Sequence, residues 1–355
     1  MYADINDVRS IKDFRGGSFS QYKIADVKTA CIKELNQSNI KNSYYWIMDL
    51  VCSGHIKEAW EILIGFYANS VNVGNPKLAI YLNMMHNNYN IIHKGGYVNY
   101  ELAMRNNHEI RKLFCEIVIV LCASNKTPTF EKIKITGEDN FNIEALSDKL
   151  KAPDVSYVNR VFRDGDPNEL YIPVNEFIYS ISKDCSQKSL WNTLFWLEWV
   201  LEYCKYYNKI KEKVIVCAHR KVPVLPIFQK DVIWIIWDCL LDKEHTTSDI
   251  QNKCIFSLFS MFVVNYKPGS KDKRKQLLYF ACKILIDKNS IDFKIPIIKD
   301  IEKYNGEEVI ECVFEALVKK QQEPNTGYLS MDGDNRTNVE KTVEKLASLD
   351  KFMNM

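Results

Sequence analysis

The chain has 355 residues, 46% hydrophobic and 26% charged, which is typical of a globular protein long enough for two domains. Its 47 lysines and arginines nearly balance its 45 aspartates and glutamates. This balance excludes a protein that binds nucleic acid or membranes through its overall net charge. Any surface for nucleic acid must therefore be local.

The first part of the chain predicts a helical bundle over residues 1–130 that begins with a polar leader. Apolar residues at helical spacing start at about 26–35, and Asn42-Ser43 is a typical cap for the next helix. The pattern continues over Trp60–Tyr67, and residues 108–123 carry a clear apolar stripe.

Residues 131–167 differ from the stretches before and after them, and we interpret them as a linker or insertion. Phe130, Ile133 and Ile135 alternate with polar residues, which predicts a short extended segment. Turn-forming residues cluster further on, at 164–167.

A second helical bundle is predicted over residues 168–320, and residues 321–355 are expected to be a mobile tail with a weak terminal helix. The fold class is therefore mainly all-α. Helical spacing in the second bundle covers 171–182, 190–207, 232–241, 250–264, 273–287 and 307–320.

Two segments of the first bundle recur, in the same order, in the second. Tyr45-Trp46-Ile47 matches Phe195-Trp196-Leu197 in residue type, and residues 106–126 resemble residues 270–289. We interpret these pairs as an internal duplication that yields two related bundles. The alternative is that any two amphipathic aromatic helices align this well.

The cysteines indicate the redox environment. Eleven occur, scattered through apolar helical stretches as at Cys52, Cys115 and Cys204. This pattern is typical of buried thiols in a reducing, intracellular compartment. The N-terminus lacks an apolar signal core, and the longest apolar runs are too short to span a bilayer, so no membrane partner is expected.

No familiar catalytic motif occurs: the phosphate-binding loop GxxxxGK[ST], the GxSxG elbow, HExxH and GxGxxG are missing. Cys52 with His55 and Cys217 with His219 offer zinc-ligand types, but no CxxC accompanies them, so we interpret them as core and helix-terminal residues. We expect no catalytic residue, metal site, cofactor or small-molecule substrate.

Two pairs of acids, Glu198/Glu202 and Asp238/Asp242, each stand four residues apart and so share a helix face. Such a pair suits a catalytic dyad only if a shared proton or a cation offsets the repulsion. The simpler interpretation is a set of salt bridges with nearby lysines such as Lys205.

Basic residues concentrate in two segments, and these are the candidate nucleic-acid contacts. Cations bind phosphates, and tyrosines interleaved with them can stack on bases. The alternative is an ordinary solvated surface. The candidates are Lys205, Lys209, Lys211, Lys213, Arg220, Lys221, Lys271, Lys273, Arg274 and Lys275.

Four tryptophans are candidates for a partner interface. Trp196 and Trp199, and likewise Trp234 and Trp237, stand three residues apart on predicted helices. Aromatic side chains are common anchors of interfaces, although the same spacing also suits a helix core.

Residues 43–121 resemble the helical, collar-like C-terminal domain that follows the ATPase module in clamp-loader-related proteins of replication and repair. The features are Tyr45-Trp46 opening a helix, Gly54 at a turn, and Gly74-Asn75-Pro76 before a further helix. The ATPase module itself has no counterpart in this chain. The leader MYADINDVRSIKDFRG and the Asn-, Lys- and Ile-rich body resemble uncharacterised proteins of large nucleocytoplasmic DNA viruses.

These resemblances imply a non-catalytic helical adaptor, a collar-like accessory of viral DNA replication or repair that binds partner proteins and also DNA. The setting they imply is the host cytoplasm, a viral factory or a virion. The alternative is a structural or assembly protein of a virus particle without nucleic-acid binding. An enzyme with an unrecognised acidic site is a third hypothesis.

Overall fold

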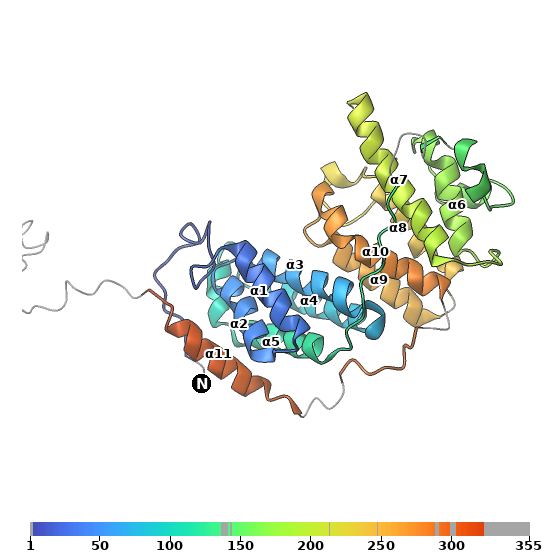
Figure 1. Ribbon diagram of the computed structural model, residues 1–355. Coiled ribbons are helices and arrows are strands. Elements are labelled where there is room, and N and C mark those ends of the chain that lie inside the picture. The colour runs from blue at the N-terminus through green and yellow to red at the C-terminus, as the bar shows by residue number, and fades with distance from the viewer. Residues whose placement is uncertain are drawn as a thin grey trace, which may run out of the picture.

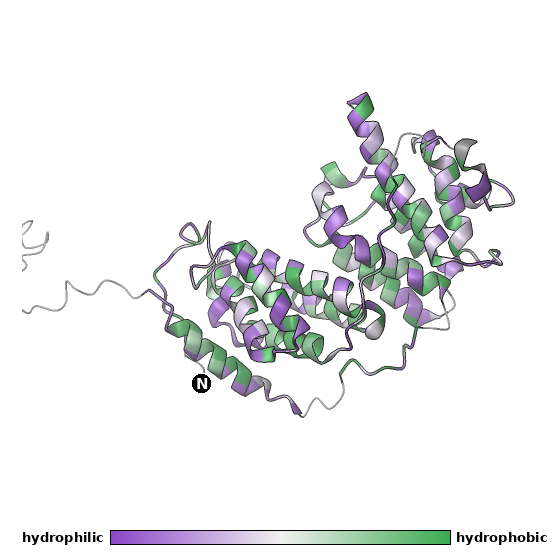
Figure 2. Cartoon of the chain, viewed as in Figure 1, coloured by the Kyte–Doolittle hydropathy of each residue, from purple (hydrophilic) through white to green (hydrophobic). Residues whose placement is uncertain are grey.

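The computed structural model describes residues 3–135, 141–142, 144–212, 214–246, 248–287, 291–298 and 303–322. These residues form α-helices joined by turns and short helical segments, and no strand occurs among them. The all-α prediction is confirmed. Figure 2 shows apolar and polar residues alternating along the helices, as amphipathic helices require.

Two groups of helices follow one another along the described chain, and a last helix returns to the first group (Figure 1). The first helix group comprises α1 (Ile24–Asn36), α2 (Ile40–Cys52), α3 (Ile56–Phe66), α4 (Leu78–Lys94) and α5 (His108–Ala123). The second helix group comprises α6 (Tyr171–Ile181), α7 (Leu190–Lys211), α8 (Ile233–Leu241), α9 (Asp249–Val263) and α10 (Lys271–Ile286). The returning helix is α11 (Gly306–Val318).

Short helical segments connect these elements. They are the π-helical turn η1 (Tyr67–Val71) and the 3-10 segments η2 (Asn72–Gly74), η3 (Glu101–Asn106), η5 (Glu144–Lys149), η6 (Tyr157–Arg160), η7 (Asn168–Leu170), η8 (Pro226–Phe228), η9 (Lys243–His245) and η10 (Pro268–Ser270). One of them precedes the last helix of each group, η3 before α5 and η10 before α10.

The two helix groups repeat the same order of packing. α1 packs on α2 as α6 packs on α7, and α5 packs on α2 as α10 packs on α7. α4 lies beside α5, and α9 lies beside α10. The two fourth helices, α4 and α9, pack against each other and join the groups. This shared order supports the interpretation of an internal duplication.

The repeated sequence segments also occupy the same register. Side-chain oxygens of Asn39 and Ser189 cap α2 and α7 by accepting from the backbone N–H three residues further on. Counted from the first residue of each helix, Trp46 and Trp196 both stand seventh. The match therefore extends from sequence to position on the helix.

A buried arginine stands fourth in the last helix of each group. Arg111 of α5 is 2% exposed, and its Nε donates to the carbonyl of Arg105 at 2.8 Å. Arg274 of α10 is 6% exposed, and its Nη1 donates to the carbonyl of Phe262 at 2.6 Å. Burial lowers the pKa of both guanidinium groups, so hydrogen-bond acceptors of the chain take the place of water around them. Arg111 also donates to the Asn106 carboxamide oxygen at 2.9 Å.

Two segments lie differently from the expected division of the chain. Helix α11, expected in the second bundle, packs against α2 and α5 of the first helix group. Within the expected linker, η6 packs against α6, so that part of it belongs to the second helix group. The leader, expected in the first bundle, contributes Ile5, Phe14 and Phe19 to the buried core.

The extended segment expected at Phe130–Ile135 forms no strand, although all its residues are described. Its first residue is instead held by a side chain of α10. The Gln276 carboxamide accepts from the Phe130 N–H at 3.0 Å and donates to the Phe130 carbonyl at 3.3 Å.

Candidate functional site

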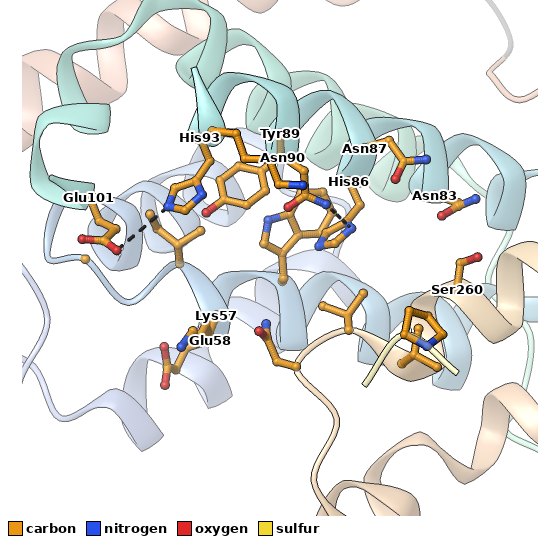
Figure 3. A pocket seen from close by; sticks show the side chains of 18 of the residues that line it. Lys57, Glu58, Asn83, His86, Asn87, Tyr89, Asn90, His93, Glu101 and Ser260 are labelled. Carbon is orange, nitrogen blue, oxygen red and sulfur yellow. Dashed lines mark hydrogen bonds and ion pairs between the residues drawn. The ribbon is translucent and has the colours of Figure 1, made fainter. Parts of the chain in front are cut away.

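A hollow of about 1010 Å³ lies where the two helix groups meet, and we call it the inter-group groove. The first group contributes α3, α4 and the connection from α4 to α5, and the second group contributes α9 and the loop before η8. Its lining includes Pro223. It also includes Lys57, Asn83, Asn87, His93 and Ser260, which Figure 3 labels.

One face of α4 supplies most of the polar wall. The helix buries its apolar face through Leu78, Leu82 and Met85, which leaves the opposite face to the groove. On that face, asparagines follow one another at positions 83, 87 and 90, and this spacing places them in a single row. Figure 3 shows all three along the same edge of the groove.

Aromatic rings form the floor below this row. Trp60 of α3 is 2% exposed, and its ring centroid lies 4.8 Å from that of His86 in an edge-on arrangement. Tyr89 and Phe114 pack on the same indole at 5.7 and 5.5 Å. The buried Trp60 Nε1 has no hydrogen-bond partner among the described residues. The floor is therefore held in place by ring packing.

The groove is polar but close to neutral. Burial lowers the pKa of His86 to about 4, so its ring is uncharged at neutral pH. Its Nδ1 lies 3.2 Å from Asn90 Nδ2, which donates to it when the proton of the neutral ring is on Nε2. Two lysines and two glutamates also line the hollow and offset each other: Lys57, Lys94, Glu58 and Glu101.

Two of the basic residues predicted to contact nucleic acid are buried and serve the fold. The Arg220 side chain is 1% exposed, donates to both carboxylate oxygens of Asp166 at 2.7 Å, and donates through Nε to Asp238 at 2.8 Å. Arg274 is held by the Phe262 carbonyl. Their assignment as nucleic-acid contacts is wrong, because buried side chains cannot reach a phosphate.

Three further candidates form ion pairs within the chain. Lys275 Nζ lies 2.8 Å from Glu198, and Lys205 Nζ lies 3.0 Å from Glu202, so the acid pair on α7 is salt-bridged as the simpler interpretation predicted. Lys271 pairs with Asp231 in the same way, at 3.0 Å.

Of the remaining candidates, Lys213 lies outside the described residues. The other four have exposed side chains: Lys209, Lys211, Lys221 and Lys273. They lie on the last turns of α7, in the loop that follows it, and on the first turn of α10.

All four tryptophans proposed for a partner interface are at most 2% exposed, so this prediction is wrong. The alternative that the spacing allowed, a core position, is correct. Trp199 stacks on Tyr203 at 4.9 Å. Trp234 donates from Nε1 to the Phe228 carbonyl at 2.6 Å, and Trp237 packs on Phe262 at 5.2 Å. The fourth residue is Trp196.

The groove residues were not identified from sequence. The 83–87–90 spacing of asparagines was the available signal, but a polar stripe on a helix usually faces water. Only the packing of α4 against α9 shows that this stripe borders a hollow.

The described cysteines are mostly inert thiols. Burial raises the pKa of Cys115 and Cys204 to about 12, and that of Cys122 and Cys217 to about 11, so all four stay protonated at neutral pH. No group of three or more metal-ligating side chains occurs within the described ranges. In the same ranges no helix has the length and apolar character needed to cross a membrane.

No protein-family model matches the chain, and no curated protein or solved structure matches it.

Proposed function

We propose that the protein is a non-catalytic helical adaptor that holds a partner protein in the inter-group groove. The observation that carries the proposal is the position of the groove. Its walls come from both helix groups, which are joined by the packing of α4 on α9. A partner seated there contacts both groups at once, so the adaptor presents one composite surface.

The chemistry around the groove favours binding over catalysis. A nucleophile or general base needs a pKa near the working pH. The buried thiols are held protonated, and His86, the histidine on the groove floor, has a pKa of about 4. The acids of α7 that suggested a dyad are neutralised by lysines. The groove also presents asparagine amides and aromatic rings, and these are typical of recognition.

More specifically, we propose that the adaptor acts in DNA replication or repair and binds DNA as a second partner. The DNA contact would be made by the exposed candidates Lys209, Lys211, Lys221 and Lys273. A virus-particle assembly role is the alternative, in which the groove would hold another particle protein.

Site-specific photocross-linking in the cells that make the protein tests the adaptor proposal. A photoreactive residue replaces Asn87 in the groove or, as the matched control, Asn36, which is exposed on α1. We expect a discrete protein adduct at position 87 that is absent at position 36. Filling the groove with Ser260→Trp should abolish that adduct. The same adducts at both positions, or no protein adduct at position 87, would contradict the proposal.

A further inference from the structure

We infer that the inter-group groove receives an extended segment of its partner and reads the main chain of that segment through the asparagine row of α4. This inference rests on the proposed function and adds the chemistry of the occupant. The row consists of Asn83, Asn87 and Asn90.

The spacing of the row suits an extended chain. Steps of four and three residues along a helix advance by about 6 and 4.5 Å. One edge of an extended chain presents a peptide N–H and C=O every second residue, roughly every 6.7 Å. Side-chain rotation makes up the difference, so neighbouring asparagines can meet successive main-chain groups.

The hydrogen-bonding capacity of the row is largely unused. Within the described residues, the carboxamides of Asn83 and Asn87 make no hydrogen bond, while Asn90 donates one N–H to His86. A carboxamide offers donors and an acceptor, as a peptide group does. It therefore satisfies main-chain groups that would otherwise lose water without compensation.

The charge of the groove argues for a main chain instead of an anionic ligand. His86 is neutral, and the lining lysines are matched by glutamates, so the site supplies no excess of cations for a phosphate or carboxylate. A docked helix fits less well, because its N–H and C=O groups already bond to each other. An extended segment has these groups available.

The dimensions set the length and character of the segment. From Asn83 to Lys94 the wall of α4 is about 16 Å long, which about five extended residues cover. The opposite wall includes Phe256, Val263 and Val264. Alternate side chains of the segment point toward that wall, so we expect apolar residues at every second position.

Selection from a random heptapeptide display library on the intact protein tests this inference, with affinities then measured by fluorescence anisotropy. We expect the selected peptides to carry alternating apolar residues and to lose about fivefold to tenfold in affinity on Asn87→Ala. Asn87→Gln, which keeps the amide, should retain more binding than the alanine variant. Asn88→Ala is the matched control on the same helix, because Asn88 is exposed and does not line the groove.

Methylation of the peptide nitrogens removes their N–H donors and leaves the side chains unchanged. It therefore distinguishes recognition of the main chain from recognition of the side chains. N-methylation at alternate positions should weaken binding at least tenfold, and N-methylation at the intervening positions should not. The inference would be overturned if neither Asn87→Ala nor N-methylation changed the affinity of the selected peptides. It would also be overturned if no peptide were selected. If the groove-dependent cross-link at position 87 persists in that case, the adaptor function stands; if it too is absent, both fail.

Discussion

The two helix groups share an order and a register, but the buried acids of the matched helices α2 and α7 have different partners. In the first group, Asp49 on α2 accepts from the Ser20 N–H at 2.7 Å, its second oxygen has no hydrogen-bond partner among the described residues, and burial raises its pKa. In the second group, Glu198 on α7 accepts from the Tyr279 hydroxyl and pairs with Lys275. The shared order and register therefore do not determine the partners of the buried acid.

Each group is also completed by a different segment. The first is closed by α11, where Arg111 lies 3.7 Å from the centroid of the Phe314 ring. The second is closed by the Arg220 ion pairs, which join the loop before η8 to Asp166 and to Asp238 on α8. The basic segments are therefore only partly available at the surface, because Arg220, Arg274, Lys205, Lys271 and Lys275 are buried or paired within the second helix group.

The largest expected effect comes from breaking the ion pairs that are specific to the second group. Arg220→Ala leaves the Asp166 carboxylate, whose side chain is fully buried, without its cation. We expect a loss of about 3–5 kcal/mol in the free energy of unfolding, measured by chemical denaturation. Lys221→Ala, at the exposed neighbour, should change it by less than about 0.5 kcal/mol. A loss below about 1 kcal/mol for Arg220→Ala would show that these ion pairs do not hold the group together.

The matched tryptophans sharpen the comparison at one register position. Trp196 is 2% exposed, whereas Trp46 is half-buried and packs edge-on against Tyr22. Trp196→Ala should cost about 3–5 kcal/mol. Trp46→Ala should cost about 1–2 kcal/mol, because part of its ring already contacts water. Equal losses in denaturation experiments would mean that the two groups pack alike at this position.

His86, on α4 of the first helix group, should make the free energy of unfolding depend on pH. The pKa of His86 is about 4 when folded against an ordinary value of 6.5. Between these values the unfolded chain binds a proton that the folded chain does not, so stability falls as the pH decreases and levels off below about 4. The contribution is at most about 3 kcal/mol.

Denaturation of the wild type and of His86→Gln at pH 7 and pH 4.5 checks this effect. The variant should lose less stability than the wild type on acidification. The matched variant is His245→Gln, because His245 is a buried histidine of the second group whose pKa is also lowered by burial. It should likewise lose less stability than the wild type on acidification. An unchanged pH dependence in His86→Gln would contradict the assignment.

Hydrophobic periodicity predicted the fold class and the helices well. The helix expected at 26–35 spans Ile24–Asn36, and the one at 108–123 is α5. Periodicity identifies the apolar face of a helix but not the element that covers it, so the position of α11 and the groove were not predictable. Likewise, a lysine looks available in sequence when its acid is far away, as with Lys275 and Glu198.

The return of α11 has a consequence for how the protein is made on the ribosome. α5 ends at Ala123, and the helix that covers it begins at Gly306, about 180 residues later. At roughly 5–20 residues per second, the first helix group emerges with one flank uncovered for roughly 10–40 s. During synthesis that flank is a site where a chaperone can bind, and it is covered only when α11 has been synthesised.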